Sequence, residues 1–160
     1  MRLYSVIFLV VLVLDQVSKF WIVSTFALYE GRAVIPGFFN LVYVTNKGAA
    51  FSMLASIESP IRHYFFVIVN SAAAIGLTIA ALKMKEIGKR YPLSLALIAG
   101  GAVGNLVDRI RFGAVIDFLD FFFGNYHWPA FNVADSAICI GVTILFIARL
   151  VDGNANNESN

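Results

Sequence analysis

Residues 64–82 read YFFVIVNSAAAIGLTIAAL and contain no charged side chain. About twenty consecutive apolar residues cross the hydrocarbon core of a bilayer as one α-helix, so this stretch predicts a transmembrane span. Three further segments, 3–23, 91–107 and 131–148, are similarly apolar. Charged residues make up only 14% of the 160-residue chain, whereas about a quarter is usual in soluble domains. We therefore expect an all-α membrane protein with four transmembrane helices.

The two ends of the chain raise separate questions. Residues 1–153 contain all four apolar segments, so we expect one integral membrane domain, followed by a polar and disordered tail over 154–160. The first segment has an alternative interpretation as a cleaved signal peptide, because Met1-Arg2 precedes a short apolar run. No A-x-A site follows that run, and it ends in the charged DQVSK, which favours a retained span.

The loops predict the orientation in the membrane. The loop between the second and third segments, KMKEIGKR, has four basic residues in eight, whereas the forty residues 24–63 have only three. Basic loops stay in the cytoplasm. This pattern places both termini in the cytoplasm and the two long connections, 24–63 and 108–131, outside.

Both long connections have a distinct composition. The first contains VIPGFFNLVYVTNKGAAF, in which turn signals flank the β-like run FNLVYV, so we expect a small β-rich extracytoplasmic segment between the first two helices. The second is crowded with aromatic residues, including Phe121, Phe122, Phe123, Tyr126 and Trp128. Aromatic rings collect at membrane surfaces. An alternative is that they form a wall for a lipid-bearing substrate.

Ionisable residues at membrane depth are rare and usually functional. Asp15 and Lys19 lie four residues apart in the first segment, so they share a helix face and can neutralise each other. Two interpretations stay open for this pair. It is either a buried ion pair that sets the orientation of the helix, or part of the framework of a site.

The third segment ends in a second polar group. Gly100 and Gly104 form a small-xxx-small face, which allows another helix to approach closely. Asn105, Asp108 and Arg109 follow within about one turn, and Arg109 could satisfy the last carbonyls of the helix. We expect these residues to act as a polar clasp between helices.

Asp117 and Asp135 form the most informative pair. Asp117 lies on the second outer connection, and Asp135 begins the fourth segment at the same membrane surface. Two carboxylates that face each other share one proton. An aspartic protease uses such a pair, with one carboxylate taking a proton from water and the other acting on the scissile carbonyl. Asn132 could orient the pair, and Asp120 is a third candidate with no obvious partner.

Other chemistry has little support in the sequence. His63 and His127 are isolated and have no ligand spacing with Cys139, so we expect neither a metal nor another cofactor. The single cysteine excludes an internal disulfide, and its apolar surroundings predict a small buried side chain. The net charge of +2 argues neither for nor against a nucleic-acid partner, and we expect none.

Five motifs in order along nearly the whole chain resemble the bacterial lipoprotein signal peptidase family (signal peptidase II): D15-Q-V-S-K19, N46-K-G-A-A-F51, G101-A-V-G-N-L-V-D-R109, V115-I-D-F118 and F131-N-V-A-D135. The resemblance implies an integral membrane aspartic endopeptidase without a metal. Such enzymes remove the signal peptide of a prolipoprotein by cutting before a cysteine that already carries diacylglycerol. They are the target of the cyclic peptide globomycin.

The resemblance also implies roles for individual residues. Asp117 and Asp135 would be the catalytic pair. The residues that shape the site or bind substrate would be Asp15, Lys19, Asn46, Gly48, Asn105, Asp108, Arg109 and Asn132. The protein would be a monomer in the bacterial cytoplasmic membrane, with its active site near the outer surface and in contact with membrane lipid.

Two other functions compete with this one. A proton-coupled transporter would also use paired aspartates and a buried Asp-Lys pair. It would place acidic residues near the bilayer midplane, however, whereas Asp117 and Asp135 fall at one surface. A structural membrane subunit would need no polar cluster on one side.

Overall fold

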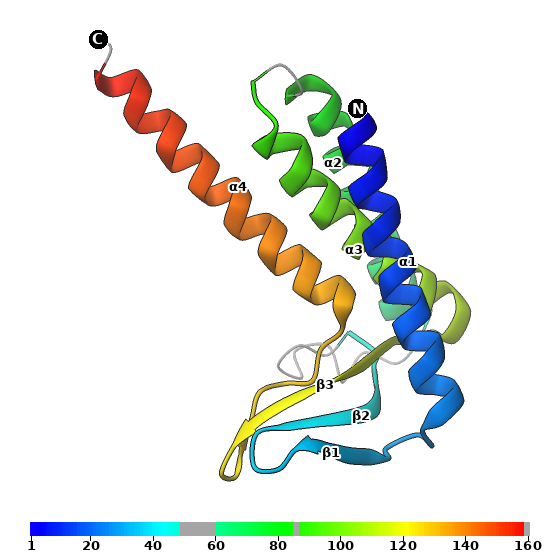
Figure 1. The fold of residues 1–160 in the computed structure, drawn as a ribbon. Coiled ribbons are helices and arrows are strands. Elements are labelled where there is room, and N and C mark those ends of the chain that lie inside the picture. Colours follow the sequence, from blue (N-terminus) through cyan, green and yellow to red (C-terminus); the bar gives the residue numbers. More distant parts are fainter. Residues whose placement is uncertain (49–59, 85–86, 159–160) are drawn as a thin grey trace.

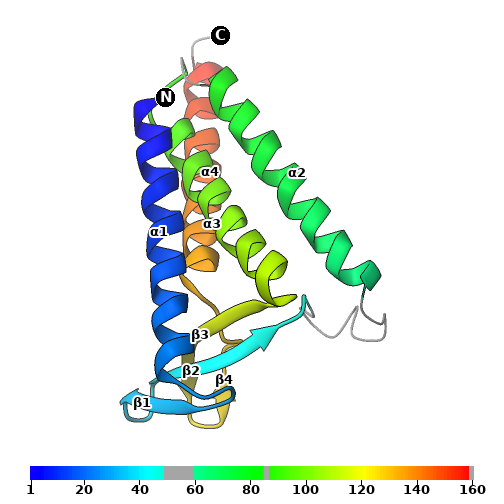
Figure 2. The ribbon, with the colours of Figure 1, turned by 90° about the vertical axis from the view of Figure 1, so that its right-hand side faces the viewer.

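The computed structural model describes residues 1–48, 60–84 and 87–158. Its long helices are α1 (Arg2–Thr25), α2 (Pro60–Met84), α3 (Arg90–Phe112) and α4 (Val133–Glu158). In this described part of the chain, all four are long and apolar enough to cross a membrane, which confirms the predicted number. Both termini lie at one end of the helices, and a small sheet lies at the other (Figures 1 and 2).

Helix α3 is the centre of the bundle and contacts each of the other three helices. The predicted small-residue face packs against α1. A Cβ atom at Gly100 would lie 3.0 Å from the carbonyl oxygen of Phe8, and one at Gly104 would lie 2.5 Å from Oδ2 of Asp15. The two glycines therefore allow a close approach that brings the polar residues of α1 and α3 together.

The sheet is antiparallel, in the order β1 (Gly31–Ile35), β2 (Phe39–Asn46), β3 (Val115–Phe123) and β4 (Tyr126–His127). Strand β2 contains the predicted run FNLVYV. The sheet is not confined to the segment between the first two helices, however, because β3 and β4 come from the aromatic second connection (Figure 2).

Strand β3 escaped prediction because it is apolar on both faces. Ile116 and Phe118 pack against Ile22 and Phe26 at the end of α1. The alternate positions point to the opposite face, where Phe121 stacks with Phe39 and Phe131. A strand buried on both faces has no alternation of polar and apolar residues by which to recognise it.

Helix ends differ from the predicted spans in one instructive place. Helix α3 continues to Phe112 and stops at Gly113, whose left-handed φ of 71° allows its N–H to donate to the carbonyl of Arg109 at 2.9 Å. Asp108 and Arg109 are therefore helical, and the chain turns directly into β3. Helix α4 extends to Glu158, and the domain boundary at residue 153 stays a prediction.

Candidate active site

The alternation of β3 separates its two aspartates. Side chains three positions apart on a strand point to opposite faces, so Asp117 and Asp120 do not share a site. Asp120 has no obvious partner in the sequence, but it has two in the structure. It accepts a hydrogen bond from Nδ2 of Asn40 at 2.9 Å and lies 2.8 Å from Nδ1 of His127. Asp120 is therefore excluded from the predicted carboxylate pair, and His127 is not isolated.

Asp117 is almost fully buried, with 3% of its surface exposed. Its Oδ1 accepts a hydrogen bond of 2.7 Å from Nδ2 of Asn132. Burial and the nearby charge of Asp135 raise the pKa of Asp117 to about 7, although hydrogen bonds to Asn46 and Asn132 oppose this rise. Asp117 is therefore a carboxyl group that can hold a proton near neutral pH.

Asp135 occupies the third position of α4 and forms a capping box with Asn132. The backbone N–H of Asp135 donates to Oδ1 of Asn132 at 2.9 Å, and the backbone N–H of Asn132 donates to Oδ2 of Asp135 at 3.3 Å. Reciprocal bonds of this kind satisfy two N–H groups that the first helical turn leaves free. A carboxylate is also favoured at a helix N-terminus by the helix dipole. These two effects explain why an acidic residue begins an apolar span.

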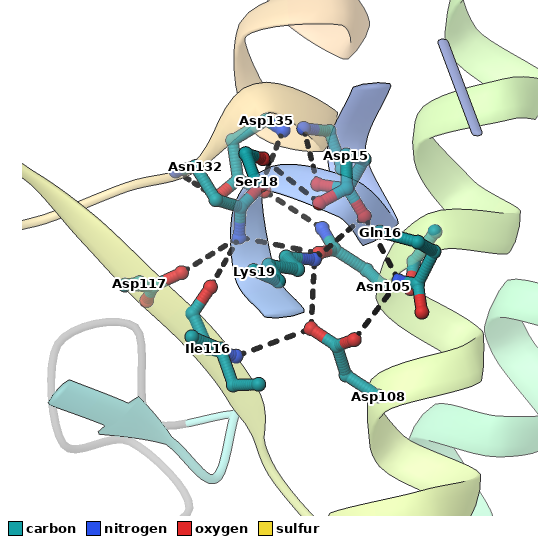
Figure 3. A network of polar contacts seen from close by, with 12 residues as sticks. Asp15, Gln16, Ser18, Lys19, Asn105, Asp108, Ile116, Asp117, Asn132 and Asp135 are labelled. Carbon is teal, nitrogen blue, oxygen red and sulfur yellow. Dashed lines mark hydrogen bonds and ion pairs between the residues drawn. The ribbon is translucent and has the colours of Figure 1, made fainter. Parts of the chain in front are cut away.

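Two asparagines connect the carboxylates (Figure 3). Nδ2 of Asn132 lies within hydrogen-bond distance of Asp117, of the carbonyl of Ile116 at 3.1 Å and of Oδ1 of Asn105 at 3.3 Å. Nδ2 of Asn105 donates to Oδ1 of Asp135 at 2.8 Å. The predicted orienting role of Asn132 thus has a geometric basis, because this one residue contacts both aspartates.

A buried network of ion pairs also contacts Asn105. Nζ of Lys19 lies 2.9 Å from Asp15, 2.7 Å from Asp108 and 3.0 Å from Oδ1 of Asn105. All three of its donors therefore have acceptors. The side chains of Lys19, Asp15 and Asp108 are at most 2% exposed. The predicted pair of Asp15 and Lys19 is part of a larger framework that reaches Asp135 through Asn105.

Asp15 also fixes the start of α4 directly. Its Oδ1 accepts the backbone N–H of Ala134 at 2.9 Å, so a side chain of α1 completes the cap of α4. Gln16, which the sequence did not single out, donates to Asp15 at 3.2 Å and to Asp108 at 3.0 Å. A glutamine in an apolar span next to Asp15 was the available signal, because a polar side chain at that depth needs partners.

Arg109 closes another side of the cluster. Its guanidinium lies 5.1 Å from the ring centre of Phe66, and its Nη1 donates to the carbonyl of Asn105 at 3.3 Å, as expected for an arginine near a helix C-terminus. Gly48 lies against the same ring: a Cβ atom there would collide with Phe66, and the φ of 95° at Gly48 favours glycine. Its N–H donates to Oδ1 of Asn46 at 2.9 Å. Phe66 is a contact residue that the sequence gave no means of identifying.

The aromatic residues of the second connection divide between the two faces of β3. Phe121 shares the face of Asp117 and stacks with Phe39 and Phe131 at 4.6 and 5.8 Å between ring centres. Phe122 stacks on His127 at the other face, and Phe123 is 84% exposed. Of this run, Phe121 is therefore the residue that packs on the face of Asp117, because Phe123 on the same face is exposed and Phe122 lies on the other.

Two further predictions can be compared with the structure. Cys139 is exposed on α4, so the prediction of a buried cysteine is wrong. The reason is that an apolar surrounding in a membrane helix does not imply burial within the protein. Ala49, Ala50 and Phe51 of the second motif lie outside the described residues.

This chain is similar to known proteins over most of its length. Residues 7–151 match the family model described as Signal peptidase (SPase) II. A lipoprotein signal peptidase of Geobacter metallireducens is 43% identical over 99% of this chain and 97% of its own length. One from Janthinobacterium sp. is 54% identical over 86% of this chain and 81% of its own. A solved bacterial membrane enzyme superposes with a TM-score of 0.84 at 33% identity, covering 96% of this chain and 90% of the other.

Proposed function

Because this chain belongs to the signal peptidase II family, we propose that it is a membrane-embedded aspartic endopeptidase that cleaves diacylglyceryl-modified prolipoproteins before the lipidated cysteine. It is a multi-pass protein of the inner membrane and a protease of lipoprotein processing. The finer proposal concerns the catalytic groups, which are Asp117 and Asp135. The observation that carries it is the contact of Asn132 with both carboxylates.

The surroundings of the two aspartates assign them different roles. Asp117 is buried, and its pKa of about 7 lets it keep a proton near neutral pH. Asp135 is half-buried at the start of α4 and accepts hydrogen bonds from Asn105 and Asn132, which suits an anion. Asp117 is therefore the acid of the pair, and Asp135 is the base.

The reaction follows from these roles. Asp135 takes a proton from a water molecule, whose oxygen adds to the scissile carbonyl carbon, while protonated Asp117 gives its proton to the carbonyl oxygen. The resulting tetrahedral diol collapses and breaks the C–N bond. The proton on Asp135 passes to the leaving amine, and one diol hydroxyl returns its proton to Asp117. Both carboxyl groups then regain their starting states.

The surrounding residues hold this arrangement in place. Lys19 and Asn105 position Asp135, and Asp15 fixes the helix that carries it. Asn46, Gly48 and Arg109 lie where the strands meet α3, and we assign them to shaping the substrate channel.

The placement in the membrane is part of the proposal. Both termini lie at the end opposite the sheet (Figure 2), and the basic loop between α2 and α3 belongs to the end with the termini. By the rule for basic loops, that end faces the cytoplasm, and the sheet with Asp117 faces outward. A lipid-anchored substrate in the outer leaflet would then reach the aspartates. We also expect a monomer that binds globomycin-type inhibitors, has no nucleic-acid partner and requires no cofactor.

The test is cleavage of a purified diacylglyceryl-prolipoprotein by the detergent-solubilised protein. Asp117→Asn should reduce cleavage by at least about a hundredfold, in line with general acid–base catalysis. Asp120→Asn, a matched change three residues along the same strand but on its other face, should retain most of the activity. Equal loss in both folded variants would reject the assignment of Asp117. Absence of cleavage by the unaltered protein on confirmed lipidated substrate would reject the peptidase and favour the transporter.

A further inference from the structure

A pocket with several polar lining residues lies away from the two aspartates. It has a volume of about 210 Å³ and lies between α1 and α3, with Gln16, Lys19, Asp108 and Arg111 among its lining residues. Ile116 also lines it, whereas the adjacent Asp117 points to the other face of β3. The pocket therefore borders the ion network on the side away from Asp117, and the proposed reaction does not use it.

The charges that line this pocket are unequal. Both carboxylate oxygens of Asp108 are already engaged, Oδ1 by Gln16 and Oδ2 by Lys19 and the N–H of Ile116. The ammonium of Lys19 has three acceptors. Arg111 differs, since among the described residues it forms no ion pair and its guanidinium contacts only the ring of Phe112, at 4.9 Å from the centre. Within the described part of the chain, the guanidinium of Arg111 therefore has no carboxylate within ion-pair distance, and its N–H donors are open to a ligand in the pocket.

The walls and depth of the pocket match those of a lipid headgroup site. Phe20 and Phe112 line it and are 72% and 51% exposed, so the rim of the pocket offers apolar surface that lipid chains can contact. Arg111 lies one residue before the end of α3, so the pocket is at the end of this candidate membrane span. The volume is below the roughly 300 Å³ of pockets that enclose whole drug-sized ligands. It suits a headgroup whose chains stay in the bilayer.

We propose that the pocket between α1 and α3 binds the phosphate of an anionic phospholipid of the surrounding membrane, through Arg111. A guanidinium is well suited to a phosphate because it donates two parallel hydrogen bonds. A zwitterionic headgroup fits less well, because Asp108, the carboxylate among the described lining residues, has both oxygens occupied and is not free to bind the amine. The bound lipid lies against the ion network that positions Asp135. The site is independent of the proposed peptidase chemistry.

The test measures bound lipid rather than cleavage. The full chain is equilibrated in micelles with equal amounts of dioleoyl phosphatidylglycerol and dioleoyl phosphatidylcholine, repurified, and its retained lipid is counted by mass spectrometry. We expect enrichment of phosphatidylglycerol, reduced roughly fivefold by Arg111→Gln, since one surface charge near a membrane has about that effect. Arg32→Gln is the matched control, because Arg32 is already paired with Glu30 at 2.9 Å.

A second variant separates the pocket from its charge. Val23→Trp fills the pocket and leaves Arg111 in place, so it should abolish the enrichment as well. Enrichment that survives Val23→Trp, in a variant with unchanged thermal unfolding, would overturn the proposal, because the charge alone would then attract lipid. Equal retention of both lipids by the unaltered chain would also overturn it. So would displacement of the lipid by millimolar inorganic phosphate, which would identify a site for the free ion.

Discussion

Replacing Lys19 by methionine is the most direct test of the ion network. The change keeps an unbranched side chain of similar length and removes the ammonium. It deletes the contacts of 2.9 and 2.7 Å to Asp15 and Asp108 and the hydrogen bond of 3.0 Å to Asn105. Asn105 retains a donor for its Oδ1 in Asn132, at 3.3 Å. The main loss of stabilising contacts should therefore be at the carboxylates of Asp15 and Asp108.

The size of the effect follows from burial. Asp15 and Asp108 are 0% and 1% exposed, so little water reaches them to replace the lost ammonium. Removing one partner from a buried ion pair costs about 3–5 kcal/mol, because a buried charge is left uncompensated. We expect Lys19→Met to lower the free energy of unfolding by that amount. Adding Asp108→Asn should recover about 1–3 kcal/mol relative to the sum of the single changes, since the residues are in contact.

The assay is reversible denaturant unfolding in mixed micelles, with Lys83→Met as the control. Lys83 is an exposed lysine in the last turn of α2, so its replacement should change stability by no more than about 0.5 kcal/mol. A loss below about 1 kcal/mol for Lys19→Met, or simple additivity with Asp108→Asn, would refute the reasoning that these groups form one buried unit.

Two further predictions test the site. The pKa of Asp117 is raised from 3.8 to about 7, so the folded protein binds more protons than the unfolded chain between these values. Its stability should therefore fall by on the order of 4 kcal/mol as pH rises through this window, and Asp117→Asn should remove that slope in unfolding measured across pH. Cleavage should also decline as pH rises through about 7, because the acid loses its proton; a rate that is flat to pH 9 would contradict the assigned role. Gly104→Ala should lower stability by about 1–3 kcal/mol, because its Cβ would meet Asp15 at 2.5 Å, whereas Gly76→Ala in open space should be neutral or stabilising in the same assay.

The sequence predicted the helices well because a transmembrane helix can be recognised from the length and the apolar composition of its segment alone. The span over residues 64–82 lies within α2 of the structure. The glycine face at Gly100 and Gly104 was also predictable, since it follows from spacing on one helix. What could not be predicted was β3, because a strand that is covered on both faces by α1 and by aromatic residues has no alternation to detect.

The contacts of the site also divide into those with a local sequence signal and those without one. The spacing of Asn132 and Asp135 was a local signal, and the capping box confirms that they interact. Contacts across helices left no such signal. Nothing in the sequence linked Asp15 to the backbone of Ala134, at a separation of 119 residues, or placed Phe66 beneath Arg109. The separation of Asp117 from Asp120 required knowledge that they lie on a strand.

The cap of α4 has a consequence for the order in which the chain is made. Asp135 and the N–H of Ala134 lie on α4, and their partners lie on α3 and α1, which precede it in the chain. A nascent chain that ends after β3 holds Asp117 but lacks Asp135, the second aspartate of the proposed pair. On the proposed mechanism, such a chain is inactive because it has no Asp135 to activate water. Proteolytic activity would then arise only after α4 has packed against α1 and α3, so a chain without α4 would not cleave the signal sequences that are inserted beside it.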